Sequence, residues 1–156
     1  MIKTLSRLTA GLLLLATLGN AAADSPYAVY KSEESFDDVM QGLKMAIEEQ
    51  GLYINSMMHM GEMLERTGKD LDLGDSIYRK AESIEFCSAL KSHKMTAENP
   101  HRIVNCPFII SVYILTSEPD TTYIVHRRLN IGDDTGIMGE VEAMLESLGE
   151  AAAEGF

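Results

Sequence analysis

The sequence feature that most limits the fold is the apolar run from Phe108 to Leu115. It is nearly continuous in isoleucine, valine and tyrosine, which is typical of a strand in the middle of a sheet. The turn at Glu118–Asp120, with proline in its second position, and the alternating segment Thr122–Leu129 predict that this strand forms an antiparallel hairpin. A sheet built around the run is therefore the centre of the predicted fold.

The other segments add strands and helices to this centre. Alternating or apolar segments predict strands over residues 24–31, 52–55 and 81–87. Helical spacing predicts helices over residues 36–50, 56–66, 88–99 and 137–153, with a brief helical turn at 76–80. In the last helix, the solvent side is expected to carry Glu140, Glu142, Glu146 and Glu150. This order indicates an α+β fold in two layers, an antiparallel sheet with helices packed on one face.

The N-terminus has the pattern of a secretory signal peptide. Lys3 and Arg7 supply positive charge, Leu8–Leu18 is apolar, and Ala21–Ala23 is a small-residue cleavage site. The apolar run is shorter than the roughly 20 residues that a helix needs to span a bilayer. We therefore expect residues 1–23 to be removed, and residues 24–156 to form a single periplasmic or secreted domain.

The charge of the chain limits its partners. It has 24 acidic and 13 basic residues, a formal net charge of -11, and loss of the leader would make it more negative still. Nucleic acids and anionic lipid surfaces repel such a chain. We expect no nucleic-acid partner and no membrane association of the mature form, whereas a homodimer remains open.

The sequence contains none of the common catalytic signatures. It has no G-x-S-x-G elbow, no H-E-x-x-H helix, no phosphate loop, no C-x-x-C dithiol and no C-x-x-C-H haem site. No catalytic residue is therefore named. A non-enzymatic binding protein is favoured over an enzyme, and a purely structural module that associates with itself through a sheet edge is a further alternative.

Sulfur and imidazole side chains form the main candidate site. His59 and Met63 are one helical turn apart, and Cys87 and Cys106 are the two cysteines. Thioether, imidazole and thiolate are soft ligands that suit Cu(I). One hypothesis is that these four residues hold copper or a haem-like group. The alternative is that the methionines fill gaps in the core.

The cysteines also allow two other interpretations. An oxidising compartment permits them to pair as one disulfide, but strand alternation places Cys87 and Cys106 on opposite faces unless Pro107 breaks it. Alternatively they act as a redox-active thiol pair, since Cys87 precedes a helix N-terminus that would favour its thiolate.

Basic residues suggest a weaker candidate site. Arg66, His126 and Arg128 would form an anion pocket if the fold brought them together, because arginine suits carboxylate and other oxyanions. The alternative is that they pair with the surplus carboxylates on the surface.

Several segments resemble a known family. They are Gly-Glu-Met-Leu-Glu-Arg-Thr at 61–67, Glu-Phe-Cys-Ser at 85–88, Asn-Cys-Pro-Phe at 105–108, Val-Tyr at 112–113, Tyr123, and His-Arg-Arg at 126–128. Over residues 27–148 the chain resembles the DUF-302 family (domain of unknown function 302), as an exported bacterial member. The resemblance implies a compact α+β domain, helices on an antiparallel sheet, a capacity for self-association and no established activity. The family's pattern falls on His59, Met63, Arg66, Cys87, Cys106 and Pro107.

Overall fold

The computed structural model describes residues 25–129 and 136–155, so the predicted signal peptide lies outside the described residues. The strands are β1 (Tyr27–Ser32), β2 (Tyr53–Met58), β3 (Tyr78–Cys87), β4 (Phe108–Leu115) and β5 (Glu118–Arg127). The helices are α1 (Phe36–Glu49), α2 (Met60–Asp70), α3 (Ala89–Glu98), the 3-10 helix η2 (Pro100–Asn105) and α4 (Gly136–Glu154). Within these two ranges, no helix has the length and hydropathy needed to cross a membrane.

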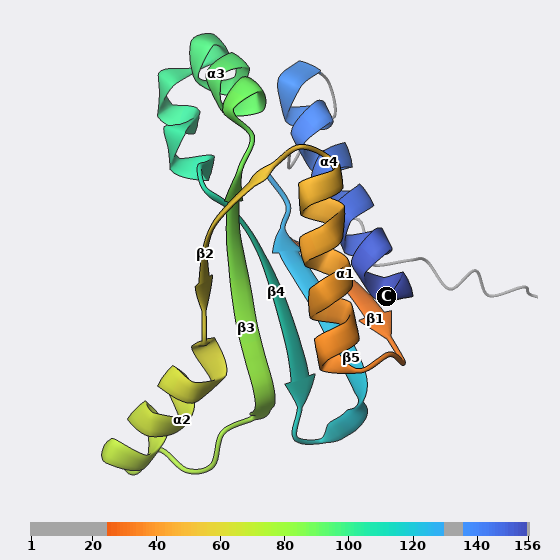
Figure 1. Cartoon of the computed structure of the whole chain (residues 1–156). Coiled ribbons are helices and arrows are strands. Elements are labelled where there is room, and N and C mark those ends of the chain that lie inside the picture. Colours follow the sequence, from red (N-terminus) through yellow and green to blue (C-terminus); the bar gives the residue numbers. More distant parts are fainter. Residues whose placement is uncertain (1–24, 130–135, 156) are drawn as a thin grey trace, which may run out of the picture.

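The five strands form one sheet in the order β1-β5-β4-β3-β2, and every neighbouring pair is antiparallel. The apolar run that predicted a central strand is β4, which pairs with β5 through the predicted hairpin and with β3 on its other side. Helices α1 and α4 lie side by side over one face of the sheet (Figure 1). The predicted α+β fold, with helices packed against an antiparallel sheet, is confirmed.

Two element boundaries differ from the prediction. Strand β2 continues to Met58 because Met57 and Met58 pair with Ile84 and Ser83 of β3, so α2 begins at Met60 and not at residue 56. The predicted helical turn at 76–80 is instead the start of β3, which begins at Tyr78. In both places a neighbouring strand supplies hydrogen bonds that local periodicity does not reveal.

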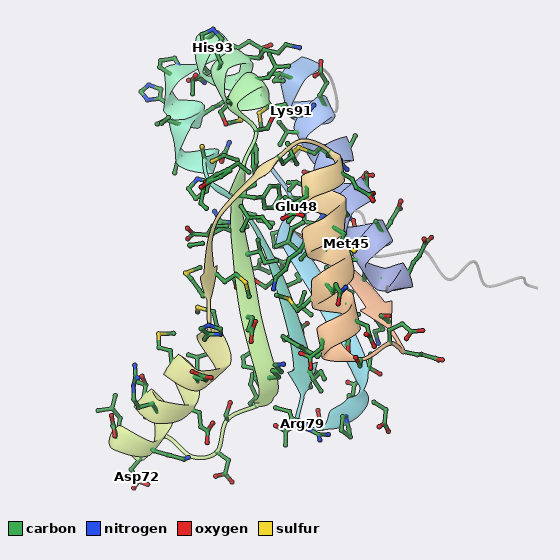
Figure 2. The ribbon with its side chains drawn as sticks, viewed as in Figure 1. Met45, Glu48, Asp72, Arg79, Lys91 and His93 are labelled. Atoms are coloured by element: carbon green, nitrogen blue, oxygen red, sulfur yellow. The ribbon has the colours of Figure 1, made fainter. Side chains whose placement is uncertain are left out.

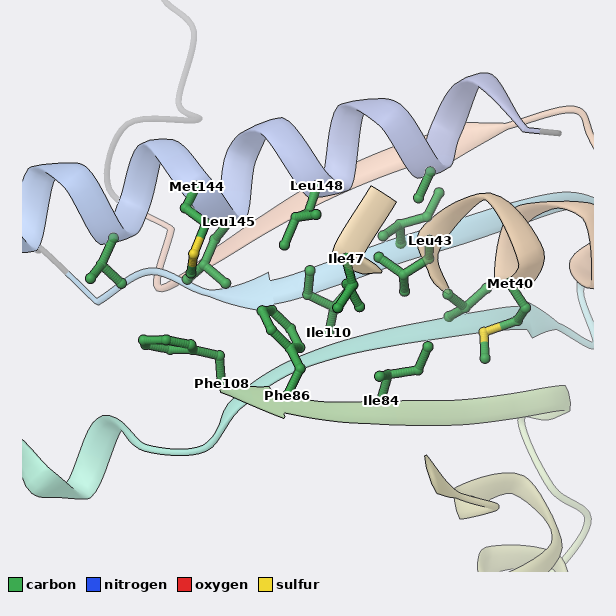
Figure 3. Close-up of a cluster of buried hydrophobic side chains, with 14 of the residues drawn as sticks. Met40, Leu43, Ile47, Ile84, Phe86, Phe108, Ile110, Met144, Leu145 and Leu148 are labelled. Carbon is green, nitrogen blue, oxygen red and sulfur yellow. The ribbon is translucent and has the colours of Figure 1, made fainter. Parts of the chain in front are cut away.

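The core lies between the sheet and the two covering helices. Helix α1 begins at an N-cap, where Ser35 Oγ accepts a hydrogen bond from the backbone N–H of Asp38 at 3.2 Å. Figure 3 shows side chains from both helices meeting those from the sheet. The fully or almost fully buried residues include Leu43, Ile47, Ile84, Phe86, Phe108, Ile110, Leu145 and Leu148. This is the contact that the amphipathic patterns of the helices require.

The opposite side of the sheet is here called the open face. It carries the strand residues that alternate with the core residues. Helices α1 and α4 both pack on the core side of the sheet and do not cover the open face. Helix α2, followed by Asp72, and helix α3, which carries His93, extend from opposite ends of the sheet (Figure 2). Large side chains on the open face are half exposed: Tyr27 by 56%, Val29 by 51% and Ile109 by 42%.

One glutamate of α4 is not on the solvent side as predicted. Glu142 is only 4% exposed. Its Oε2 accepts a hydrogen bond from the backbone N–H of Leu129 at 2.9 Å, and its Oε1 lies 3.5 Å from Arg128 Nη1. The two residues after β5 supply a donor and a positive charge at this position, which allows a carboxylate to be buried.

Candidate functional site: a pair of thiols

The two cysteines meet at one end of the sheet. Cys87 is the last residue of β3, and Cys106 lies between η2 and β4. Their Sγ atoms are 3.3 Å apart, both side chains are partly buried, and both thiols are free. A disulfide has an S–S bond of about 2.05 Å. The sulfurs are therefore in contact and need to move by only about an ångström to bond.

The local structure explains how the pair forms. The β3–β4 pairing ends at Phe86 and Phe108, whose buried rings lie 5.8 Å apart. Between them the chain leaves the sheet through α3, which is capped by Ser88, and returns through η2. Strand β4 begins only at Phe108, so its alternation does not extend to Cys106. The prediction that Cys87 and Cys106 lie on opposite faces of the sheet therefore does not apply.

Two polar side chains complete the site. Asn55 Nδ2 donates to Cys87 Sγ at 3.2 Å, and Ser92 Oγ donates to Cys106 Sγ at 3.5 Å. Asn55 lies where the β2–β3 register shifts between Ile54 and Ser56. Sequence reasoning missed both residues, and the chain offers no local signal for either, because they reach the sulfurs from other elements.

The surroundings of Cys87 disfavour its thiolate. Burial raises the pKa of the Cys87 thiol, the neighbouring Cys106 and Glu85 raise it further, and the amide of Asn55 acts in the opposite direction. The net direction is opposite to the lowering that was expected from the helix after Cys87. Cys87 is held as a neutral thiol at neutral pH, and either sulfur can donate in the contact between them.

His59 and Met63 do not join the thiols. His59 Nδ1 lies 3.4 Å from Glu82 Oε1, and Met63 is exposed on α2. Glu82 is five residues before Cys87 on β3, a separation of about 16 Å in an extended strand. The expectation that all four side chains meet at one point is therefore wrong for His59 and Met63. In residues 25–129 and 136–155, no group of three or more His, Cys, Asp or Glu residues is placed to hold a metal ion.

The basic residues do not form a common pocket either. Arg66 is exposed on α2 beside Glu62, Glu65 and Lys69. Arg128 Nη1 lies 3.2 Å from Glu146 Oε1 and also faces Glu142, so carboxylates of the chain already occupy it. His126 is buried beneath α4. For Arg128, this arrangement agrees with the alternative that the basic residues pair with carboxylates.

Comparison with known proteins places the chain in a family. The family model described as "Domain of unknown function DUF302" matches residues 28–154, which include both cysteines and nearly all of the described structure. The chain belongs to the DUF302 family. A search of curated proteins found no match.

The fold of this DUF302 chain also occurs in a solved structure. The crystal structure of an uncharacterized conserved protein DUF302 from Bacillus stearothermophilus matches with a TM-score of 0.68 and 16% sequence identity. The match covers 81% of this chain and 98% of the other. At this identity the comparison supports the fold, and the function must be argued from the site.

A second polar contact in the DUF302 fold lies beneath α4. The ring of Tyr30 stacks on His126, and Tyr30 Oη lies 3.2 Å from His126 Nε2. His126 Nδ1 donates to the carbonyl of Arg127 at 3.1 Å, which leaves Nε2 as the acceptor of the tyrosine hydroxyl. Burial and the carboxylates of Glu146 and Glu150 raise the pKa of Tyr30 to about 12.

This pKa predicts a loss of stability at alkaline pH. Tyr30 ionises near its ordinary pKa of 10.0 in the unfolded chain but near 12 in the folded chain. The folded state therefore retains a proton that the unfolded state has lost, and stability present below pH 10 falls as the pH rises towards 12. Urea unfolding midpoints measured across this range should fall less steeply in Tyr30→Phe, which cannot ionise. Equal slopes in both proteins would contradict the assignment.

Proposed function

We propose that this protein is an exported thiol-redox protein in which Cys87 and Cys106 alternate between a dithiol and a disulfide. The observation that carries the proposal is the 3.3 Å contact between the two Sγ atoms. Partial exposure leaves the pair accessible to another molecule. The signal-peptide pattern supports an oxidising compartment, in which such a pair would meet disulfides.

The partner of the reaction is a disulfide of another molecule. The thiolate of Cys106 attacks one sulfur of that disulfide, which forms a mixed disulfide and releases the other sulfur as a thiol. Cys87 then loses its proton to solvent and attacks Cys106 Sγ, which releases the second thiol of the partner. The protein is oxidised by two electrons, and the partner disulfide is reduced to two thiols.

The environment of the sulfurs supports this order of events. Each sulfur accepts one side-chain hydrogen bond, Cys87 Sγ from Asn55 and Cys106 Sγ from Ser92, so the two thiols differ chiefly in what acts on Cys87. Burial, together with the neighbouring Cys106 and Glu85, raises the pKa of the Cys87 thiol, so its thiolate is scarce at neutral pH. The proposal therefore gives the first attack to Cys106 and the resolving step to Cys87.

The proposal predicts a reversible intramolecular oxidation. Equilibration of the purified protein in glutathione or dithiothreitol buffers, followed by alkylation and intact-mass measurement, should show both thiols lost together within one chain. Exchange-active pairs have midpoints between about -120 and -270 mV, whereas structural disulfides lie below about -300 mV. A midpoint in the first range supports the proposal. Thiols that stay reduced in excess oxidised glutathione, or a structural midpoint, would overturn it.

Single variants assign the roles in the same experiment. With a small disulfide as substrate, Cys87→Ser should accumulate a stable mixed disulfide at Cys106, because the resolving thiol is absent. Cys106→Ser should react much more slowly, because Cys87 is held as a neutral thiol. Ser147→Ala, an exposed position on α4, is a matched control that should behave as the wild type. The reverse order of reactivity would exchange the two roles.

A second candidate function is binding of Cu(I) by the same two sulfurs. Two adjacent thiolates are soft ligands of the kind that this ion prefers. Titration of the reduced protein with Cu(I), and separately with haem, distinguishes this function from the first. Tight binding of one equivalent that is lost in Cys87→Ser but kept when His59 and Met63 are replaced by alanine would support the copper site.

A further inference from the structure

The open face of the sheet carries a run of apolar residues in a strongly acidic chain, with Lys31 of β1 lying over the ring of Tyr123 at one side of the run. Val29, Val125 and Ser111 are paired neighbours on β1, β5 and β4. Tyr27 and Ile109 lie on the same face, two residues along their strands from Val29 and Ser111. On a solvated face of a chain with net charge -11, charged residues would be expected to outnumber exposed apolar ones. Contiguous exposed apolar surface of this kind marks an interaction site.

The polar groups in the floor of the open face are already satisfied. Ser83 and Ser111 lie opposite each other on β3 and β4, and their hydroxyls share a hydrogen bond of 2.7 Å. Tyr123 donates its hydroxyl to Glu118. Covering this floor therefore leaves no side-chain hydroxyl of these residues without a partner, which removes the main cost of burial.

Two opposite charges flank the centre of this face at the same level. Glu85 on β3 pairs directly with Ile109 on β4. On the other neighbour of β4, strand β5, His126 pairs with Ile110. Because the two strands are antiparallel, the next residue, Arg127, is level with Ile109. His126 points into the core, which turns Arg127 to the open face, where it lines a hollow of about 260 Å³ with Tyr27 and Ile109. The row therefore reads arginine, isoleucine, glutamate across three adjacent strands.

This row is complementary to itself. Consider a two-fold axis that runs parallel to β4 above Ile109. It lays β5 of one copy over β3 of the other at the same level, because β5 and β3 are the two neighbours of β4. Arg127 of each copy then faces Glu85 of the other, and the two Ile109 side chains meet in the centre. An isologous interface has this property, that residue i meets j and j meets i.

We infer that the open face is the interface of a homodimer, with a central Ile109–Ile109 contact and two Arg127–Glu85 ion pairs related by a two-fold axis. Within the described part of the chain, Arg127 forms no ion pair of its own. Its charge is therefore available to a second copy. Neither cysteine takes part in the pairing, but Glu85 also raises the pKa of the nearby Cys87 thiol, so the inference is tested by the association of two copies and not by thiol reactivity.

Reciprocal charge reversal tests the inference. Analytical ultracentrifugation of the exported, purified chain between about 1 and 100 μM should show a dimer. Ile109→Asp should raise the dimer dissociation constant by at least about 100-fold, since it buries two like charges in contact. Arg127→Glu and Glu85→Arg should each raise it by about 10-fold or more, and the double variant should restore it towards the wild-type value.

Two controls show whether the effects belong to the open face. Glu48→Arg reverses an exposed charge on α1, on the helical side of the molecule (Figure 2), and should leave the dissociation constant unchanged. Circular dichroism should show that Ile109→Asp remains folded, because Ile109 is 42% exposed and outside the core. A monomeric wild type, a dimer unaffected by Ile109→Asp, or a double variant as weak as the single variants would each overturn the inference.

Discussion

Phe86→Ala is expected to lower the free energy of unfolding by about 3–5 kcal/mol, the usual cost of deleting a large aromatic side chain from a packed core. Phe86 is fully buried and packs on Phe108 at a centroid distance of 5.8 Å. The substitution removes apolar surface from the core and leaves a cavity that the neighbouring helices fill only in part. Urea or thermal unfolding of the reduced protein measures the loss.

The same substitution should disturb the thiols, because Phe86 directly precedes Cys87 and pairs with Phe108, two residues after Cys106. Without the contact between the Phe86 and Phe108 rings, the two sulfurs are held less closely, and intramolecular oxidation should slow. Leu90→Ala is a suitable control, since Leu90 is 66% exposed on the neighbouring helix α3 and its loss should change stability by less than about 0.5 kcal/mol. A loss below about 1 kcal/mol for Phe86→Ala would show that this part of the core is loosely packed.

Oxidation of the thiol pair is expected to stabilise the protein by roughly 3 kcal/mol. A bond between Cys87 and Cys106 closes a loop of about 20 residues and lowers the entropy of the unfolded chain by a corresponding amount. Because the sulfurs are already in contact, the folded state needs little rearrangement to form the bond. Unfolding midpoints of the oxidised and reduced protein, measured in the same buffer, give the difference directly.

Cys106→Ser should abolish this difference completely, because the remaining thiol has no partner in the chain. The variant under oxidising conditions should then be about as stable as the reduced wild type under reducing conditions. A disulfide that forms but destabilises the protein would show that the bonded geometry strains the end of β3. That outcome would favour the dithiol as the working state and the Cu(I) alternative over the redox cycle.

The parts of the fold that local patterns encode were predicted well. Helix α1 has a capping serine, a continuous apolar stripe and a terminal glycine, and the structure places it at the predicted residues. Strand β4 and its hairpin partner β5 follow from the apolar run and the proline turn. The junction of β2 and α2 was not predicted correctly, because the methionine-rich segment around Met57 fits a strand and a helix equally well.

The candidate site was only half predictable. Both cysteines were recognised as its members, but their alternation argued for opposite faces, and whether they meet depends on where β4 begins. The proposed ligands His59 and Met63 were assigned by chemical type and spacing, whereas the register of β2 on β3 carries them away from the sulfurs. Asn55 and Ser92 became visible only as contacts.

The sequence by itself determined the α+β class, the central strand and the faces that are buried, because apolar periodicity directly records which side of each element leaves water. Tertiary structure alone decided that the two thiols touch, that His59 pairs with Glu82, and that Glu142 is buried against Arg128. These contacts join residues far apart in the chain. Strand register and the course of the connecting segments determine them, and no local pattern of side chains specifies either one.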